Sequence, residues 1–407
     1  MLLSSRVKGA TDSVTLKVSE RMQELINEGR HIYNLTSGQL PFKPMPSFLE
    51  AIRGQVNFLK SYQYSPIIGF QELRSKFMAE YSKKRDVDLE NEALEFDCII
   101  SNGSKHSLYN VLGALVNPGD EVIILTPFWV SYPEMIKFWS GTPIVVKAHA
   151  YDAYTPHIDN IRKALTPKTK AIILNSPNNP AGIHYSEKWM QEFAVFLKEN
   201  PDLVVISDEV YADICYFDPA PRFYYQFDAE LLKQTIIVSG ISKSFSSTGL
   251  RIGYTIADRK LIRGMEKLQG QTTSGASALI QRALIDFSFD DLKSFFDNMK
   301  IQLRDCAQVL REEFRHNGIP EAWYQTTSAF YYLLDLSRTP YFQDKYADKE
   351  GDFAEEICAE ILEQTSVALV PGSTFGYPNS ARLSLVLEPA PFQEAISRLI
   401  KFLATKN

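Results

Sequence analysis

Short apolar runs alternate with helical patterns through the middle of the chain. The runs are rich in Ile, Val and Leu, and amphipathic or turn-forming stretches separate most of them. Strands that are apolar throughout belong to sheets buried on both faces, and helices between them are typical of parallel sheets. The pattern predicts strands at 96–101, 121–125, 143–146, 170–174, 203–206, 235–238 and 252–257, with helices at 104–116, at 131–139 and after residue 186.

The last third of the chain has a different pattern. An amphipathic helix is predicted from about 291 to 313, which is long enough to link two domains. Strands and helices then mix in an order typical of α+β domains. The strands are predicted at 328–334, 367–370 and 381–387, and the helices near 352–363 and 391–404.

Length and composition narrow the class of protein. A chain of 407 residues is too long for one ordinary core, so two domains are expected. The net charge of −6 argues against a nucleic-acid partner. No apolar stretch has the length of a membrane span or forms a signal peptide, so a soluble, cytoplasmic protein is expected.

Cysteine and histidine spacing gives no sign of a metal site. The four cysteines are far apart, no CxxC occurs, and the six histidines show no HExxH spacing. We expect no metal and no disulfide framework, and we interpret the thiols as inert core residues. They are Cys98, Cys215, Cys306 and Cys358.

The strongest candidate for chemistry is the segment 239–253. Lys243 follows the apolar run 235–238, lies among small residues, and precedes Arg251 by eight positions. An uncrowded amine can lose its proton and form a Schiff base, and the arginine can hold an anionic cofactor group. Most lysines are solvated surface residues, so this interpretation depends on the rest of the chain.

Three other segments favour a bound anionic cofactor, although each has a simpler explanation. Ser104 begins a helix after a strand, where a phosphate or a plain N-cap is expected. Trp129 follows the next strand and is either a stacking ring or a core residue. Asn179 lies in an Asn-Pro turn that either fixes its amide or only turns the chain.

Two charged residues lie next to or within apolar strands. Asp208 follows an apolar run and is costly there without a cationic partner, unless it lies at the surface. Arg382 lies inside the apolar run 381–387, where it needs an anion. Its planar fork fits a carboxylate, and a structural ion pair is the alternative. No P-loop and no GxGxxG motif is present.

Taken in order, these segments resemble the class I aminotransferases, which are fold-type-I enzymes dependent on pyridoxal 5′-phosphate (PLP). The resemblance extends from about Leu35 to Leu387 and is nearest to bacterial-type aspartate aminotransferases. It implies the α/β PLP-dependent transferase fold, with a mostly parallel seven-stranded sheet between helices and a smaller α+β domain. The large domain is expected at 46–290 and a discontinuous small domain at 1–45 and 291–407. A homodimer with shared active sites is also implied.

The resemblance assigns cofactor contacts to single residues. Lys243 is the Schiff-base lysine, Asp208 holds the pyridine nitrogen, Asn179 and Tyr211 bind the phenolic oxygen, and Trp129 stacks on the ring. The remaining contacts are to the phosphate. They are expected from Ser104 and Lys105 through backbone amides, from Ser242 and Arg251, and from Tyr64 of the neighbouring subunit, with Tyr62 as a nearby competitor.

Substrate contacts follow from the same resemblance. Gly38 lies in a loop near the substrate, and Arg382 with Asn179 binds the substrate carboxylate. The stretch 112–115 contains no cation, although some relatives have a lysine near this point that binds the acidic side chain of the substrate. The sequence therefore does not decide whether the amino donor is aspartate, a related amino acid or an aromatic one. Ser247, Gly240 and Ser328 depart from residues usual in the family.

The resemblance implies transfer of an amino group from an L-amino acid to a 2-oxo acid by a ping-pong mechanism. A PLP-dependent β-eliminating C–S lyase would use nearly the same residues and remains the alternative. A non-catalytic PLP-binding regulator is disfavoured. The pattern begins within about 35 residues, which leaves no room for a DNA-binding domain, and the chain is acidic.

Overall fold

A seven-stranded sheet forms the centre of the larger part of the molecule. The computed structural model describes residues 3–9, 14–91, 94–217 and 221–405. The strand order is β2-β8-β7-β6-β5-β3-β4, and only β8 runs antiparallel to its neighbours. The mostly parallel sheet predicted from the apolar runs is confirmed. Its strands are β2 (Phe96–Ser101), β3 (Glu121–Leu125), β4 (Thr142–Val146), β5 (Thr169–Asn175), β6 (Val204–Asp208), β7 (Thr235–Gly240) and β8 (Gly253–Asp258).

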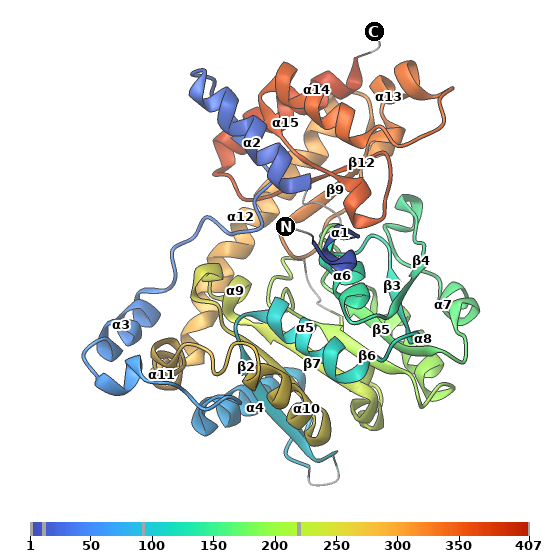
Figure 1. Ribbon diagram of the computed structural model, residues 1–407. Coiled ribbons are helices and arrows are strands. Elements are labelled where there is room, and N and C mark those ends of the chain that lie inside the picture. The colour runs from blue at the N-terminus through green and yellow to red at the C-terminus, as the bar shows by residue number, and fades with distance from the viewer. Residues whose placement is uncertain (1–2, 10–13, 92–93, 218–220, 406–407) are drawn as a thin grey trace.

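Successive residues of the central strands enter two different cores. In β3, Val122 and Ile124 pack on one face of the sheet, whereas Ile123 and Leu125 pack on the other. Side chains alternate along a strand, so a strand buried on both faces is apolar throughout. One face is covered by α5 (Ser104–Leu115), α6 (Ser131–Phe138) and α10 (Arg259–Gly270), and the other by α4 (Gln71–Arg85) and α8 (Glu187–Lys198) (Figure 1).

The helices predicted at 104–116, at 131–139 and after residue 186 are present as α5, α6 and α8. Ser186 precedes α8, and its hydroxyl accepts the N–H of Trp189 at 3.2 Å, which is an N-cap. The remaining helices of this part are α3 (Pro46–Gln55), α7 (Ile158–Ala164), α9 (Ile241–Ser244) and α11 (Ala278–Asp286).

The C-terminal part begins with the long helix α12 (Leu292–His316). It buries Leu303, Leu310 and Phe314, and it ends three residues beyond the predicted position. Figure 1 shows it running from the lower part of the molecule to the upper part. The upper part contains the strand order β11-β12-β9 and several helices. They are β9 (Tyr331–Asp335), β11 (Val370–Pro371), β12 (Ser380–Ser384), α13 (Pro340–Tyr346), α14 (Ala354–Thr365) and α15 (Pro389–Ala404).

The N-terminal segment pairs with this upper part. β1 (Tyr33–Asn34) runs parallel to β10 (Val367–Ala368), and Leu25 of α2 (Val14–Asn27) packs against Leu362. Helix α1 (Ser5–Lys8) precedes α2. Residues 1–2 and 10–13 of the segment 1–45 lie outside the described residues.

Three predicted strands in the C-terminal part are wrong in detail. The run 367–370 forms two strands, because the chain leaves β1 after Ala368 and pairs with β12 from Val370. The strand expected from 328 begins at Tyr331, since Ala329 has a left-handed backbone with φ of 54°. The strand expected to reach residue 387 ends at Ser384, where its pairing with β9 stops.

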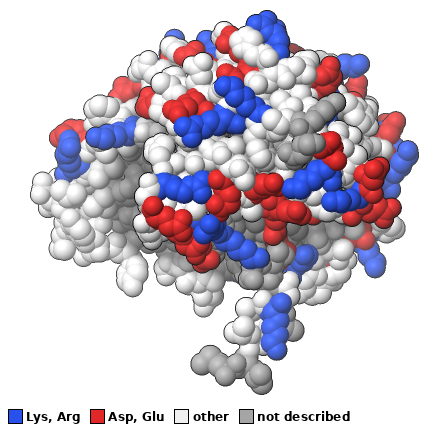
Figure 2. Space-filling model, turned by 90° about the horizontal axis from the view of Figure 1, so that it is seen from above, with Lys and Arg blue, Asp and Glu red and all other residues white. Residues whose placement is uncertain are grey.

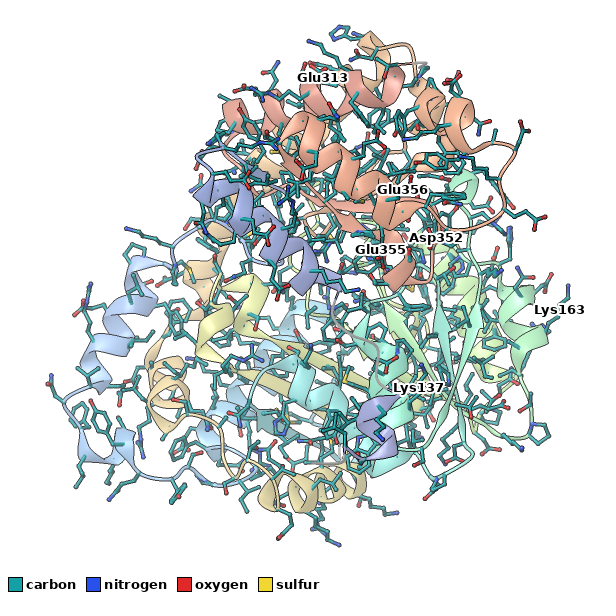
Figure 3. All side chains as sticks on the ribbon, turned by 45° about the horizontal axis from the view of Figure 1, so that its top comes forward. Lys137, Lys163, Glu313, Asp352, Glu355 and Glu356 are labelled. Atoms are coloured by element: carbon teal, nitrogen blue, oxygen red, sulfur yellow. The ribbon has the colours of Figure 1, made fainter. Side chains whose placement is uncertain are left out.

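The surface carries charges of both signs. Figure 2 shows Lys and Arg interspersed with Asp and Glu on the face seen from above. Asp352, Glu355 and Glu356 lie together at the start of α14 (Figure 3), where negative charge complements the helix dipole. The Asp352 carboxylate also accepts the N–H of Ala354 at 3.1 Å. Among the described helices, none is long and apolar enough to cross a membrane.

Candidate active site

A cavity of about 410 Å³ lies at the carboxyl ends of β5, β6 and β7. Ligands bind at this edge in open α/β sheets. The cavity brings together every residue that the sequence predicted to contact cofactor or substrate within one chain. They are Gly38, Ser104, Lys105, Trp129, Asn179, Asp208, Tyr211, Ser242, Lys243, Arg251 and Arg382.

Lys243 lies on α9, directly after β7. Its Nζ donates a hydrogen bond to the carbonyl of Gly38 at 2.6 Å. Burial, followed by the positive charges of Arg382 and Arg251, lowers the pKa of Lys243 to about 8. Near neutral pH a larger fraction of this amine is neutral than for an exposed lysine, and only the neutral amine is a nucleophile.

Asp208 ends β6 and is 3% exposed. The phenol of Tyr132 donates a hydrogen bond to Oδ2 at 2.5 Å, and the N–H of Val210 donates to Oδ1 at 3.4 Å. Burial raises the pKa of Asp208 to about 6, although both hydrogen bonds favour the carboxylate. A cation against this carboxylate would offset the cost of its burial.

Glu209 follows Asp208 but is held on the opposite side of the sheet. Its carboxylate accepts hydrogen bonds from Tyr81 and Tyr225 at 2.9 and 3.0 Å, and from Ser207 at 2.9 Å. Successive side chains of a strand point to opposite faces. The two adjacent acids therefore lie in different environments. Of the two, only Asp208 lines the cavity.

Arg382 is 7% exposed and lies on β12, which comes from the upper part of the molecule. Its guanidinium donates to Asn179 Oδ1 at 3.2 Å and to the carbonyl of Thr36 at 2.7 Å, whereas its buried Nε has no partner among the described residues. Within the described chain, neither Arg382 nor Asp208 forms an ion pair. Burial lowers the pKa of Arg382. The cavity thus contains a buried cation that lacks an anion.

The turn of Asn179 lies between Asp208 and Arg382. Asn175 holds it, because its Oδ1 accepts the N–H of Asn179 at 3.0 Å and its Nδ2 donates to the carbonyl of Asp208 at 3.0 Å. The peptide bond between Asn179 and Pro180 is cis. On the same side, the hydroxyls of Tyr211 and Tyr331 are 3.2 Å apart.

The start of α5 forms the other end of the cavity. Gly103 caps this helix without a side-chain bond, so backbone N–H groups of its first turn are open. Lys105 and Arg251 both line the cavity here, and burial, followed by the positive charge of Arg251, lowers the pKa of Lys105. Two cations beside a helix N-terminus form a site for a dianionic group such as phosphate.

Close packing at this end requires glycine. A Cβ on Gly253 would lie 2.3 Å from the backbone N of Ser104, and one on Gly240 would lie 2.6 Å from the Ser104 hydroxyl. That hydroxyl instead donates to the carbonyl of Ser239 at 2.9 Å. Gly240 stands where several relatives are expected to have a serine, and the close approach of Ser104 and of the backbone at 252–253 leaves little room for a Cβ here.

Trp129 and Gly38 complete the walls of the cavity. The Trp129 ring lies 4.8 Å from Lys105 Nζ and packs edge-on against Tyr132. Gly38 contributes its carbonyl, and a Cβ there would meet only ordinary contact at 3.5 Å.

Tyr64 is the one predicted site residue that the chain does not bring to the cavity. Its side chain is 94% exposed, whereas Tyr62 is anchored by a hydrogen bond from its hydroxyl to the carbonyl of Val56 at 2.6 Å. The contact expected from Tyr64 is to the phosphate site of the neighbouring subunit, and it stays a prediction.

Sequence reasoning missed Tyr132, Asn175 and Tyr331. Asn175 lies in the quoted Asn-Pro segment and could have been singled out as the last residue of a buried strand. Tyr132 lies three residues after Trp129 and resembles any core aromatic residue. Tyr331 reaches the site from another sheet, so no local signal marks it.

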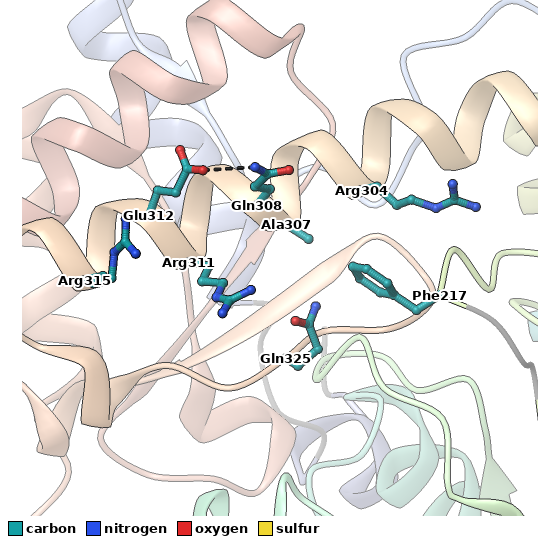
Figure 4. Close-up of a pocket in the computed structure, with 8 residues that line it drawn as sticks. All are labelled: Phe217, Arg304, Ala307, Gln308, Arg311, Glu312, Arg315 and Gln325. Atoms are coloured by element: carbon teal, nitrogen blue, oxygen red, sulfur yellow. Dashed lines mark hydrogen bonds between the residues drawn. The ribbon is translucent and has the colours of Figure 1, made fainter.

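A different cavity of about 440 Å³ runs along α12 (Figure 4). Arg304, Arg311 and Arg315 project from one helix flank, and Gln325 faces them. None of the residues predicted to carry chemistry lines it. In the described residues no group of His, Cys, Asp and Glu could hold a metal ion.

Known proteins with similar sequences and structures are aminotransferases, which agrees with the arrangement of residues in the cavity. The family model for "Aminotransferase class I and II" matches residues 30–399. The chain belongs to this family. The aspartate aminotransferase of Bacillus sp. (strain YM-2) is 32% identical to this aminotransferase, with 98% of this chain and 99% of that protein covered.

Two further comparisons bear on the same family. The asparagine–oxo-acid transaminase of Streptococcus mutans is 30% identical, covering 98% of this chain and 99% of that protein. The solved structure of Thermus thermophilus aspartate aminotransferase with maleate superimposes with a TM-score of 0.87 at 29% identity, covering 99% of this chain and 100% of that one. The resemblance to class I aminotransferases and the fold inferred from the sequence are confirmed.

Proposed function

We propose that the cavity binds PLP and catalyses transfer of an amino group from an L-amino acid to a 2-oxo acid. One observation carries the proposal. A lysine with a lowered pKa lies in the same cavity as a buried carboxylate and a buried guanidinium, and neither of these has an ionic partner in the described chain. The carboxylate matches the protonated pyridine nitrogen of the cofactor, and the guanidinium matches the α-carboxylate of the substrate.

The residues present fit the cofactor. Asp208 would hold a protonated pyridine nitrogen, and Asn179 and Tyr211 would bind the phenolic oxygen. Trp129 would stack on the ring. The phosphate would lie against the backbone amides of Ser104 and Lys105, with Ser242 and Arg251 beside it. When bound, PLP links to amines through its aldehyde and withdraws electrons from a substrate Cα.

Lys243 and Arg382 would act on the substrate. The Nζ of Lys243 would hold the cofactor through its aldehyde and, as a neutral amine, would take the proton from the substrate Cα. Arg382 binds the α-carboxylate with its fork and so fixes that Cα near Lys243. Asn179, which already accepts from Arg382, holds the guanidinium in place.

Aspartate or a related amino acid, including an aromatic one, is the proposed donor. The relatives named above are described as aspartate or asparagine enzymes. They are transaminases by description, which favours transamination over the C–S lyase reaction considered from the sequence. The cations that line the described cavity are Lys105, Lys243, Arg251 and Arg382, and all of them except the Lys105 ammonium are matched to a cofactor or carboxylate group.

A visible absorption spectrum tests the function. The PLP-loaded protein should lose its band when the donor amino acid is added and regain it with a 2-oxo acid. The corresponding amine without an α-carboxylate should leave the band unchanged, because it offers Arg382 nothing to bind. A band that responds to no amino acid, or release of ammonia without an oxo acid, contradicts the proposal.

The pKa of Lys243 predicts how PLP attachment depends on pH. Below its pKa of about 8, the neutral fraction of the amine rises tenfold for each pH unit. We expect the attachment rate to the cofactor-free protein to rise with this slope up to about pH 8 and then level off. Stopped-flow absorbance measures this rate. A rise that continues to about pH 10.4 would indicate an ordinary exposed lysine and contradict the assigned pKa.

A homodimer is proposed from the segment around Tyr64. Exposed apolar side chains gather between residues 56 and 67, which is typical of an interface. They are Val56, Phe58, Leu59, Tyr62, Tyr64 and Ile67. Tyr64 of each subunit would reach the phosphate site of its partner, so each site would be completed by both chains.

Tyr64→Phe tests this arrangement. We expect PLP to bind about tenfold more weakly, since a hydrogen bond to a charged group is lost. Tyr62→Phe is the matched control, because its hydroxyl bonds within its own chain. Equilibrium dialysis measures both affinities, and sedimentation measures the dimer. A monomeric protein, or equal PLP affinity in the two variants, would rule out the shared site.

The domain division and the location are proposals of the same kind. The pairing of β1 with β10 supports grouping 1–45 with 291–407, and the seven-stranded sheet supports a large domain at 46–290. Limited proteolysis should cleave first near these boundaries. A cytoplasmic location is checked by cell fractionation, where recovery with membranes would contradict it.

A further inference from the structure

A third cavity lies behind the helical turn that carries Lys243. Its volume is about 720 Å³, and we call it the rear cavity. Helix α9 separates the two spaces. Ser242 and Lys243 line the candidate active site, whereas Ile241 and Ser244 line the rear cavity. The rest of the rear cavity comes from α4, from residues 212–215, from the end of β7, from Phe245 and Tyr254, and from residues 289–300, which include the start of α12.

The rear cavity carries excess positive charge. Five basic and three acidic residues line it, which gives a net charge of +2 if all are ionised, or +1 when Glu209, the partner of Arg85, is included. Two of the acids are already paired with lysines. Lys293 and Lys300 form no ion pair within the described chain. The basic residues are Lys83, Lys84, Arg85, Lys293 and Lys300, and the acidic ones are Glu80, Asp213 and Asp290.

Arg85 has unused hydrogen-bonding capacity. Its side chain is only 13% exposed, and its buried Nε has no partner among the described residues. Its ion pair with Glu209 is long, at 3.6 Å, because Tyr81, Tyr225 and Ser207 already donate to that carboxylate. An anion beside Arg85 would supply the missing acceptor.

The pKa of Lys84 also reflects the crowding of positive charge in the rear cavity. Burial of the ammonium, followed by repulsion from Arg85 and Lys300, lowers the pKa of Lys84, although 46% of its side chain is exposed and it forms an ion pair with Asp213. A bound anion would reduce the repulsion among these cations.

Aromatic rings form one wall of the rear cavity. Phe77 stacks on Tyr254 with ring centroids 4.4 Å apart, and Phe289 lies 5.6 Å from Phe77. Phe296 lies 5.6 Å from Lys84 Nζ, so an apolar ring and a cation adjoin at one point. A flat apolar ligand would find both surface area and stacking partners here.

We propose that the rear cavity binds a small aromatic anion. Its ring would lie against Phe77, Phe289 and Phe296, and its carboxylate or phosphate would lie among Lys84, Arg85 and Lys300. The site is separate from the one that holds the cofactor, so it does not depend on the proposed reaction.

Calorimetric titration of the PLP-loaded protein with phenyl phosphate and with benzoate tests this site. Inorganic phosphate serves as the probe without a ring, and ionic strength is kept constant because surface charges are screened by salt. We expect saturable binding of an aromatic probe and weaker binding of inorganic phosphate. The tighter of the two aromatic probes identifies the anionic group.

Two variants and a matched control locate the binding. Lys300→Gln should weaken the aromatic probe about tenfold, which corresponds to one charge-assisted hydrogen bond. Phe296→Leu should weaken the aromatic probe but not inorganic phosphate. Lys163→Gln removes an exposed lysine at the outer edge of α7 (Figure 3) and should change nothing.

Several results would overturn the proposal. Equal affinity for the aromatic probe in wild type and in Lys300→Gln would place the ligand elsewhere, including at Arg382. Binding of inorganic phosphate as tight as that of phenyl phosphate would show that the aromatic rings of the rear cavity do not contribute to binding. Absence of saturable binding in the wild type would remove the site altogether. Circular dichroism confirms that each variant is folded before titration.

Discussion

Replacement of Lys243 by alanine should lower kcat by a factor on the order of 10⁴ or more, since it removes the amine that bonds the cofactor and moves the Cα proton. The cavity should still bind PLP, because Asp208, Arg251 and the start of α5 remain. Steady-state kinetics with the donor identified by absorption measures the loss. Dialysis followed by phosphate analysis measures the retained cofactor.

Lys105→Ala is the matched control for this variant. Lys105 lines the same cavity, but it is expected to contact the phosphate through its backbone amide, which alanine keeps. We expect its kcat to fall far less than that of Lys243→Ala. Transamination by Lys243→Ala at more than about one hundredth of the wild-type rate would mean that another group transfers the proton.

Asp208→Asn should produce the second largest loss, a fall in kcat of about 10²–10³-fold. Asparagine has nearly the same shape but cannot carry the charge that keeps a pyridine nitrogen protonated. Breaking a buried ion pair costs about 3–5 kcal/mol, and about 1.4 kcal/mol corresponds to tenfold. Single-turnover absorbance with the donor amino acid measures this step without product release.

Tyr132→Phe separates the charge of Asp208 from its surroundings. The variant keeps the carboxylate and loses the 2.5 Å hydrogen bond, so we expect a loss of about tenfold or less. That hydrogen bond lowers the pKa of Asp208, so its removal should move the acid limb of the pH profile upward. Equal losses in Asp208→Asn and Tyr132→Phe would show that the charge itself is unimportant.

Much of the site could be predicted because parallel strands end at one edge. Asn179, Asp208 and Lys243 follow three different strands, and the topology brings their positions together whatever lies between. The strands of the large sheet could also be predicted from the sequence, since burial on both faces leaves an unbroken apolar run. Arg382 could be predicted because a charge inside such a run demands a partner.

The remainder depends on contacts that sequence spacing does not encode. Tyr132 is 76 residues from Asp208, and Tyr331 is 120 residues from Tyr211. Each looks like an ordinary core aromatic until the fold pairs it with a polar group. The split of 367–370 into two strands was hidden for the same reason, since a change of partner strand leaves the apolar pattern intact.

The adjacent acids at the end of β6 set a limit on how this site can be altered or transplanted. Asp208 and Glu209 are assigned to opposite faces only by the pleat of the strand. Deleting or inserting one residue within Val204–Asp208 would exchange them, directing Glu209 into the cavity and Asp208 toward Tyr81. The number of residues in this strand must therefore be preserved for the chemistry to survive.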